Sequence, residues 1–206
     1  MFKYTIPAIL HWLMPTYTWK VKTKDKQLFL TFDDGPHPQI TPWVLALLKE
    51  YDAKATFFCV ADNVKKFPET YKEVLNQGHT TGNHSFHHLN GWKTNTQPYL
   101  ADVELASEYI SSNLFRPPYG RIRRQQAKAL QDKYKIIMWN RLSRDYEKNL
   151  NVNESLAQMK QVDNGSILVF HDSEKSFENL KVLLPELLSF YKQEGYQMLS
   201  IPNTLA

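Results

Sequence analysis

Short apolar runs alternate along the chain with longer stretches in which apolar residues recur at helical spacing. Apolar runs of this length, rich in β-branched and aromatic residues, predict strands, and the helical spacing predicts amphipathic helices. Two of the helical stretches start with a polar residue followed by proline, which is typical of a helix start. The pattern predicts seven strands, at 27–32, 55–60, 79–82, 114–116, 135–139, 166–170 and 197–200, and six helices, at 42–51, 68–77, 98–111, 125–133, 153–161 and 177–193.

The alternation of strands and helices predicts an α/β fold, with a parallel sheet whose strands are joined by helical crossovers. Seven short strands in 206 residues favour a small, incomplete parallel (β/α) barrel, and an open doubly wound sheet is the alternative. No internal repeat, low-complexity tract or long linker divides the chain, so we expect residues 1–206 to form a single domain.

The composition agrees with a globular domain of this size. Hydrophobic residues make up 42% of the chain and aromatic residues 13%, which is enough for a sizeable core. The net charge of +4 is mildly basic, but no nucleic-acid-binding motif accompanies it, so we expect no nucleic-acid partner. The single cysteine, Cys59, excludes an intramolecular disulfide and fits a reducing compartment.

The first 25 residues form a segment of their own. They begin with an apolar stretch that Pro7, His11 and Pro15 interrupt, and they lack an Ala-x-Ala cleavage pattern. Such a stretch is too short and too broken to span a membrane, and it lacks the features of an export signal. We expect residues 1–25 to pack on the domain of a cytoplasmic protein, with peripheral membrane contact as the alternative.

Polar and titratable residues follow the predicted strands at their carboxyl ends. In parallel α/β folds the residues just past each strand gather at one edge of the sheet, where active sites form. The sequence therefore predicts a site at that edge, built from Asp33-Asp34, NHSFHH, RPPYG, WNRLSRDY and FHD.

The stretch LFLTFDDGPHP places Asp33 and Asp34 at the end of an apolar run, just before the turn residues Gly35 and Pro36. Two adjacent carboxylates repel each other, so a cation is a candidate for compensating them. Because neighbouring side chains on an extended strand point to opposite faces, one aspartate can bind a metal while the other faces a substrate. The alternative is that both cap the turn.

The stretch GNHSFHH contains His84, His87 and His88. Imidazole together with carboxylate suits zinc or another divalent transition metal. Offsets of three and four residues both fit one helical face, so spacing does not choose between His87 and His88 as the partner of His84. No glutamate lies between the histidines, which excludes the zinc-protease helix motif, and a polar surface loop remains the alternative.

Two further segments carry candidate catalytic groups. In LFRPPYG, paired prolines stiffen the backbone, Arg116 can hold a carboxylate through two N–H groups, and the Tyr119 amide can stabilise an oxyanion. In ILVFHDS, His171 ends a buried strand and can donate a proton to a leaving group. Taken alone, each also fits a structural role, as a rigid loop or a buried capping histidine.

Together and in this order, these segments resemble the polysaccharide deacetylase family, carbohydrate esterase family four. The resemblance covers about residues 28–200. TFDDG is similar to the family's first motif, HSFHH to its His-Ser/Thr-x-x-His motif, RPPY to its third motif and VFH to its last. The second of these matches selects His84 and His88 and leaves His87 outside.

The resemblance implies a distorted parallel barrel and hydrolysis of an acetamide on an amino sugar. It also implies one divalent metal ion, zinc in the first place, with Co²⁺, Ni²⁺ and Mn²⁺ as alternatives. The ligands it implies are Asp34, His84 and His88. The other implied roles are general base for Asp33, orientation of that base for Arg116, an oxyanion contact for the Tyr119 amide and general acid for His171.

One segment departs from the family pattern. The fourth motif is usually written Asp-x-x-Asp-Trp, whereas this chain has LSRDY, with Leu142 in place of the first aspartate and Tyr146 in place of the tryptophan. Asp145 matches the carboxylate that orients the final histidine. Tyr146 can still stack on a sugar, and Trp92 and Trp139 are further candidates, although for Trp139 we favour core packing.

All six arginines fall within residues 116–144, and the other 19 basic residues are lysines. Arginine suits two-pronged recognition of carboxylate or phosphate, and three of the six lie before or at a predicted helix start, where positive charge is mildly unfavourable. We therefore expect the substrate to carry an anionic group, such as a muramyl carboxylate, a phosphate or a lipid-linked diphosphate. A solvated basic surface is the alternative. The three arginines before or at the predicted helix start are Arg121, Arg123 and Arg124, and the other three arginines are Arg116, Arg141 and Arg144.

The sequence thus predicts a metal-dependent hydrolase that removes N-acetyl groups from N-acetylglucosamine-type sugars in a bacterial cell-wall glycan or its precursor. An O-acetyl esterase or a small-amide hydrolase would use the same metal site. A third hypothesis, a catalytically silent carbohydrate-binding protein, is prompted by the altered fourth motif. The retained base, metal ligands and acid argue against it, because a binder gains little from all three.

Overall fold

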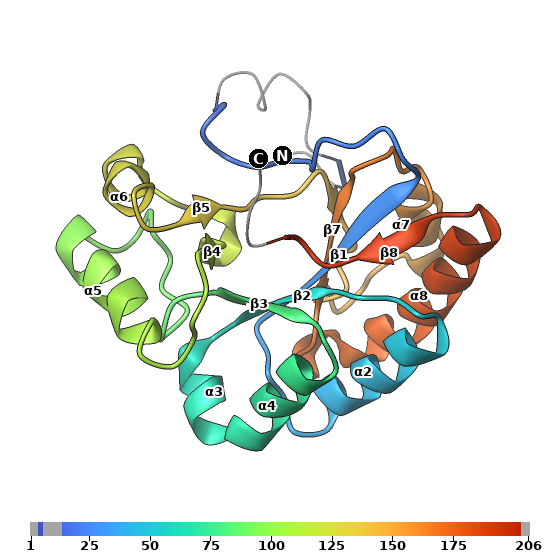
Figure 1. Ribbon diagram of the computed structural model, residues 1–206, viewed down its shortest axis with the longest axis horizontal. Helices are drawn as coiled ribbons and strands as arrows, with labels where there is room; N and C mark the ends of the chain where they lie inside the picture. The colour runs from blue at the N-terminus through green and yellow to red at the C-terminus, as the bar shows by residue number, and fades with distance from the viewer. Residues whose placement is uncertain (1–3, 6–13, 203–206) are drawn as a thin grey trace.

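The structure is a computed structural model that describes residues 4–5 and 14–202. At its centre lies a curved sheet of parallel strands in the order β5-β4-β3-β2-β1-β7-β6, with β8 paired to β1. Helices lie around the outside of this sheet (Figure 1). The prediction of a distorted, incomplete parallel barrel is confirmed.

All seven predicted strands are present, and an eighth, β6, was not predicted. Its two residues are half-buried and pair with Leu168 and Val169 of β7, so pairing rather than local pattern defines it. The strands are β1 Gln27–Asp33, β2 Thr56–Cys59, β3 Thr80–Asn83, β4 Leu114–Phe115, β5 Lys135–Ile136, β6 Arg141–Leu142, β7 Ile167–His171 and β8 Gln197–Leu199.

All six predicted helices are present as well. The additional helix α3 starts after Val60, whose side chain cannot cap it, and the Ala61 amide instead donates to the Ser85 carbonyl at 3.0 Å. None of the helices among the described residues is long and apolar enough to cross a membrane. The helices are α2 Ile40–Glu50, α3 Ala61–Lys66, α4 Pro68–Asn76, α5 Thr96–Ala106, α6 Arg124–Leu130, α7 Val152–Met159 and α8 Glu174–Gln193, with a 3₁₀ turn, η1, at Pro118–Gly120.

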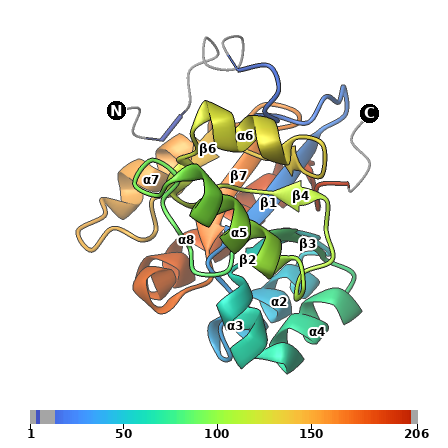
Figure 2. The ribbon, with the colours of Figure 1, turned by 90° about the vertical axis from the view of Figure 1, so that its left-hand side faces the viewer.

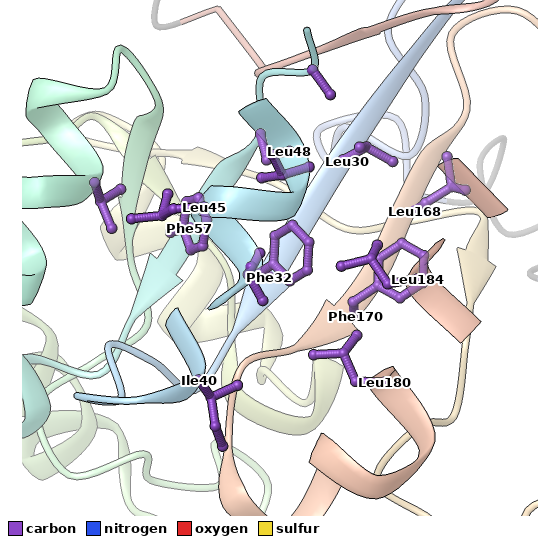
Figure 3. Close-up of a cluster of buried hydrophobic side chains, with 14 of the residues drawn as sticks. Leu30, Phe32, Ile40, Leu45, Leu48, Phe57, Leu168, Phe170, Leu180 and Leu184 are labelled. Carbon is purple, nitrogen blue, oxygen red and sulfur yellow. The ribbon is translucent and has the colours of Figure 1, made fainter. Parts of the chain in front are cut away.

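Strand β1 divides its side chains between two layers. Leu28, Leu30 and Phe32 point outward and pack with leucines of α2 and α8 in the main core, part of which Figure 3 shows. Each such side chain stabilises the fold by about 1.5–3 kcal/mol through burial. The alternate residues, including Phe29, face the inside of the barrel, where a smaller apolar cluster lies. By the same alternation Thr31 and Asp33 also face inward.

At one end of the sheet, α5 and α6 pack together beside β4 (Figures 1 and 2). A second core cluster joins them, with Tyr99 and Val103 of α5, Phe115 of β4 and Leu130 of α6 among its buried members. This cluster anchors the segments that precede and follow η1, and so holds the RPPYG loop at the edge of the sheet.

Strand β5 is shorter than predicted, ending at Ile136 instead of residue 139. The reason is a buried arginine. The carbonyls of Ile137 and Met138 accept hydrogen bonds from Arg116 Nε and Nη2 at 3.3 and 3.0 Å, so they do not join a strand ladder. The chain exchanges regular strand pairing for contacts that hold a charged side chain inside the barrel.

The described part of the N-terminal segment packs on the domain. The Tyr4 carbonyl accepts a hydrogen bond from the Leu142 amide at 2.9 Å, and Thr18 forms a bridge with Ile137. Trp19 is buried. The prediction for residues 1–25 otherwise lies partly outside the described residues, at 1–3 and 6–13.

Candidate active site

A pocket of about 590 Å³ opens at the carboxyl ends of the strands. The polar segments that the sequence places after β1, β3, β4 and β7 all contribute to its lining, as expected for parallel strands that end at one edge. The lining residues that bear on the chemistry are Asp33, Asp34, His84, His88, Lys93, Tyr119, Arg121, Trp139, Leu142, Tyr146, His171 and Lys175.

Asp33 projects from the inner face of β1 and meets Arg116. Nη1 of Arg116 donates to Asp33 Oδ1 at 2.7 Å and to Thr31 Oγ1 at 2.7 Å. The guanidinium is fully buried and stacks on the Phe58 ring at 4.1 Å, so this ion pair is screened from bulk water. A buried arginine with so many partners has little freedom, and it fixes the position of the Asp33 carboxylate.

Asp34 leaves the strand, because its backbone has a φ of 79°. This left-handed conformation is uncommon for a residue other than glycine, and it separates the Asp34 side chain from that of Asp33. Asn63 Nδ2 holds the turn by donating to the Asp34 carbonyl at 2.8 Å. Burial alone would raise the pKa of the Asp34 carboxyl, but His88, His171 and His84 lower it well below its usual range.

His84 presents one ring nitrogen to this carboxylate. Its Nδ1 lies 2.7 Å from the Arg116 carbonyl, which can only accept, so Nδ1 carries the proton and Nε2 keeps its lone pair. Burial lowers the pKa of His84 to about 4, although Asp33 and Asp34 act in the opposite direction. A neutral imidazole with a free Nε2 is the form that binds a metal.

Asp34, His84 and His88 converge. Asp34 Oδ1 lies 3.7 Å from His84 Nε2 and 3.2 Å from His88 Nε2, and one donor atom from each of the three residues lies within 4.8 Å of the others. Their chemistry fits a divalent metal, since one carboxylate oxygen and two imidazole nitrogens suit zinc or a similar ion. Three protein ligands are also the number that catalytic zinc sites use.

His87 lies outside this group. Its side chain is 58% exposed, and its Nδ1 contacts Asp102 Oδ1 at 2.5 Å. The other Asp102 oxygen accepts the amides of Phe86 and His87, at 3.0 and 3.1 Å. The loop therefore uses His87 for its own structure, while the positive φ of 56° at His88 accompanies the turn that brings that ring to Asp34.

On the opposite side of the pocket, Asp145 holds His171. Asp145 Oδ1 lies 2.7 Å from His171 Nδ1, and Oδ2 accepts the His171 amide at 2.8 Å. Asp145 is fully buried. Burial by itself would lower the pKa of His171, but Asp145 and, less strongly, Asp34 and Asp33 raise it to about 9. His171 is therefore a cation at neutral pH, with Nε2 free to donate a proton.

Two tyrosines of the pocket lie beside these groups. Tyr146 meets His171 edge to face, with the ring centroids 5.1 Å apart. The Tyr119 ring centroid is 4.6 Å from that of His88, the residue is 60% exposed, and its backbone has a φ of 61°. Tyr146 thus occupies a wall next to His171, where the family pattern has tryptophan.

The two tryptophans differ. Trp139 lines the pocket and also packs against the core cluster at α5 and α6 and the smaller cluster inside the barrel. It thus combines the two roles that the sequence analysis weighed against each other. Trp92 is 58% exposed and lies outside the pocket lining, with Nε1 donating to the Ile122 carbonyl at 3.2 Å.

The predicted arginines also differ in their position relative to the pocket. Arg121 lines the pocket. Arg123 donates to the Trp92 carbonyl at 2.7 Å, and Arg124 begins α6 and is exposed, so neither is among the lining residues. Arg141 bonds to Thr5, and Arg144 pairs with Glu147.

Asp172 was missed in the sequence analysis. It is fully buried, and its carboxylate accepts the Gly35 amide at 3.1 Å and the Thr41 hydroxyl at 2.5 Å. A Cβ on Gly35 would lie 2.1 Å from Asp172 Oδ2, so only glycine fits. Asp172 braces the turn that follows Asp34. Its place beside His171 was the only signal, and sequence does not show where it points.

Residues 20–135 match the family model described as polysaccharide deacetylase. A peptidoglycan-N-acetylglucosamine deacetylase of Bacillus cereus (strain ATCC 14579) is 32% identical over 198 residues, which cover 91% of this chain and 92% of that protein. The peptidoglycan-N-acetylmuramic acid deacetylase PdaC of Bacillus subtilis (strain 168) is 28% identical, over 88% of this chain and 39% of its own length.

Solved structures agree with the fold. The Bc1960 peptidoglycan N-acetylglucosamine deacetylase superposes with a TM-score of 0.83 at 27% identity, covering 94% of both chains. A carbohydrate esterase family four pseudoenzyme from Bacillus anthracis, BA3943, superposes with a TM-score of 0.78 at 23% identity, over 91% of this chain and 68% of that one. At that identity the second likeness concerns the fold alone.

Proposed function

This chain belongs to the polysaccharide deacetylase family and is a hydrolase of carbon–nitrogen bonds other than peptide bonds, and we propose that it removes N-acetyl groups from N-acetylglucosamine-type sugars with the help of a divalent metal. The proposal rests on one observation: three sets of chemical groups lie together in one pocket. They are the metal-ligand set, a carboxylate held by a buried arginine and a protonated histidine.

Asp34, His84 and His88 are the residues that would hold the metal. When bound, the ion supplies Lewis-acid polarisation of the acetyl carbonyl and favours deprotonation of water. Two contacts within the chain support this assignment. The Arg116 carbonyl fixes the tautomer of His84, and Asn63 holds the turn that carries Asp34.

Asp33 is placed to act as the general base. It takes a proton from the water molecule whose oxygen attacks the acetyl carbon. Arg116 serves it as a positioning residue, because the ion pair at 2.7 Å fixes the position of the carboxylate. We assign the backbone N–H of Tyr119 to the developing oxyanion.

His171 is placed to act as the general acid. An amide nitrogen is a poor leaving group until it is protonated, so the carbon–nitrogen bond breaks as His171 Nε2 transfers its proton to that nitrogen. The products are acetate and the free amino sugar. Asp145 keeps His171 oriented and protonated through its contact at 2.7 Å.

The names of the relatives support the choice of substrate. The B. cereus and B. subtilis proteins are named for N-acetylglucosamine and N-acetylmuramic acid in peptidoglycan, and we assign this chain a glycan of the same kind. An exposed Tyr119 and a half-buried Tyr146 on the pocket walls offer flat surfaces for sugar rings.

The test measures acetate released from N-acetylglucosamine oligomers and peptidoglycan strands, with an O-acetylated glycan and a small acetamide as competing substrates. We expect release from the N-acetylated glycans by protein loaded with Zn²⁺. Asp33→Asn should reduce kcat about 10²–10⁴-fold while the protein still binds the metal. Faster turnover of the ester or the small amide would overturn the N-deacetylase assignment. Glycan binding without acetate release would identify a silent binding protein.

A further inference from the structure

The pocket has more cationic than anionic side chains available to a ligand. Its lining contains two acids, and both are engaged: Asp33 pairs with Arg116, and Asp34 faces two histidines. It also contains three basic side chains, Lys93, Arg121 and Lys175. Among the described residues, none of these three has a carboxylate within ion-pair distance.

Five lysines elsewhere on the described surface are neutralised by neighbouring acids. The three pocket cations come from three separate segments, namely the loop after β3, the segment after η1 and the start of α8, and they share no acid. Unpaired like charges that gather in one concave site raise the free energy of the empty protein, and an anionic ligand relieves that repulsion. The neutralised lysines are Lys20, Lys66, Lys72, Lys133 and Lys181.

One wall presents Lys93 and Arg121 on a braced support. The Arg121 guanidinium lies 5.1 Å from the Trp92 ring centroid, and its carbonyl accepts the Gly91 amide at 3.2 Å. Buried Gln126 donates to the Gly91 carbonyl at 3.0 Å and to that of Thr94 at 3.2 Å, which ties the loop that carries Lys93 to α6. A stacked, half-buried guanidinium is pre-organised for two-pronged binding of an anion.

The opposite wall presents Lys175. It is the second residue of α8, where the positive end of the helix dipole disfavours a cation, so helix stability does not account for it. Its Nζ lies 5.2 Å from the Tyr146 ring centroid, and Tyr146 in turn contacts His171. Lys175 thus stands on the side of the proposed general acid, and the other two cations stand on the side of His88 and Tyr119.

We propose that this pocket binds an anionic glycan, with Lys93 and Arg121 on one side of the reacting acetamide and Lys175 on the other contacting carboxylate or phosphate groups of the substrate. The inference rests on the proposed function and names its substrate class. A polymer in which N-acetylglucosamine alternates with a carboxylate-bearing N-acetylmuramic acid would offer such groups on both sides of the acetamide. The sequence analysis grouped Arg123 and Arg124 with Arg121, but this proposal assigns these two residues no contact with the substrate.

The test compares kcat/KM on matched substrates. They are a chitooligosaccharide, a peptide-free muramic-acid-containing strand, the same strand with its carboxylates converted to neutral methyl amides, and an N-acetylglucosamine phosphate. The wild-type protein should prefer the carboxylate strand over its amide form by about tenfold or more, the lower range of the effect of a focused field. The preference should shrink as ionic strength rises to about 0.15 M. The phosphate arm shows whether phosphate replaces carboxylate as the recognised group.

The variant with Lys93→Gln, Arg121→Gln and Lys175→Gln should lose this preference. The control with Lys65→Gln, Lys128→Gln and Lys148→Gln removes the same charge from exposed sites outside the pocket and should keep it. Equal loss in both variants, or a wild-type protein without preference, overturns the inference and leaves the proposed function intact.

Equilibrium binding to the Asp33→Asn protein separates the two proposals. Tighter, salt-sensitive binding of the carboxylate strand supports the inference even if the wild-type protein releases no acetate, in which case only the proposed function fails. Equal binding of the acidic and amide strands overturns the inference whatever the turnover.

Discussion

His84 and His171 face the same pocket from opposite sides and are both largely buried, yet they hold different protonation states. The Nδ1 of each has an oxygen partner at 2.7 Å. For His84 the partner is the neutral carbonyl of Arg116, so burial prevails and lowers the pKa to about 4. For His171 it is the charged Asp145, and the pKa rises to about 9.

The difference shows how one residue type can hold two protonation states, which suit the two roles proposed for these histidines. A metal ligand needs a lone pair, and a general acid needs a proton. The atom that accepts from Nδ1 decides between them, because a carbonyl dipole fixes the tautomer and a carboxylate also stabilises the cation. Substitutions at the proposed metal ligands, at His171 and at Asp145 should each disturb this division, to a decreasing extent.

Removal of a proposed metal ligand should have the largest effect. His88→Gln should abolish stoichiometric Zn²⁺ binding and lower kcat/KM about 10³-fold or more, because several kcal/mol of charge stabilisation disappear. Metal content and calorimetric affinity measure the binding. His87→Gln, one residue away, is the control and should keep the metal. If both variants bind Zn²⁺ like the wild-type protein, the metal-ligand set is wrong.

Removal of the proposed acid should affect turnover alone. His171→Gln should lower kcat about 10²–10⁴-fold and leave Zn²⁺ affinity unchanged, because the ion-binding side keeps all of its donors. Steady-state kinetics and calorimetry on the same preparation test this. A parallel loss of metal would show that His171 belongs to the ligand set, and the contrast with His84 would then collapse.

A milder change converts His171 into a histidine without a carboxylate partner. Asp145→Asn keeps an oxygen near Nδ1 but removes the charge, so the pKa of His171 should fall from about 9 toward its ordinary 6.5. The basic limb of the kcat/KM profile should move down by the same amount, with about a thirtyfold loss at pH 8. Superimposable profiles for variant and wild type would contradict the assignment.

The smallest effect concerns stability. The pKa of His171 is raised in the folded protein, so its contribution to stability is fully present below about pH 6.5 and is lost as the pH rises toward 9. Urea unfolding of the metal-free protein between pH 6 and 10 should show this decline. Asp145→Asn should flatten it. A variant curve that runs parallel to the wild type throughout would argue against the shift.

Much of the fold could be predicted because the patterns are local. Alternating apolar residues in β1 and helical spacing in α8 predict their elements from a few neighbours each. The two elements that were missed, β6 and α3, are short and depend on partners far along the chain. The early end of β5 depends on Arg116, whose reach into the barrel no local pattern reveals.

The residues of the candidate site likewise fall into those that the sequence predicted and those that it did not. Motif order selected Asp34, His84 and His88, and the structure brings them together. The bracing by Asp172 and the pocket positions of Lys93 and Lys175 were not foreseen, because a buried aspartate and two surface lysines have no distinctive sequence context. The roles of these three residues depend on the groups that surround them in the folded protein.

The sequence by itself determined the family, the parallel barrel and the residue types of the chemistry, because these follow from spacing along the chain and from the order of the motifs. The tertiary structure alone decided which imidazole is neutral, which arginine reaches the pocket and which charges remain unpaired. Those properties depend on distance and burial among residues remote in sequence, since pKa and ion pairing respond to the surrounding charges and dielectric rather than to chain order.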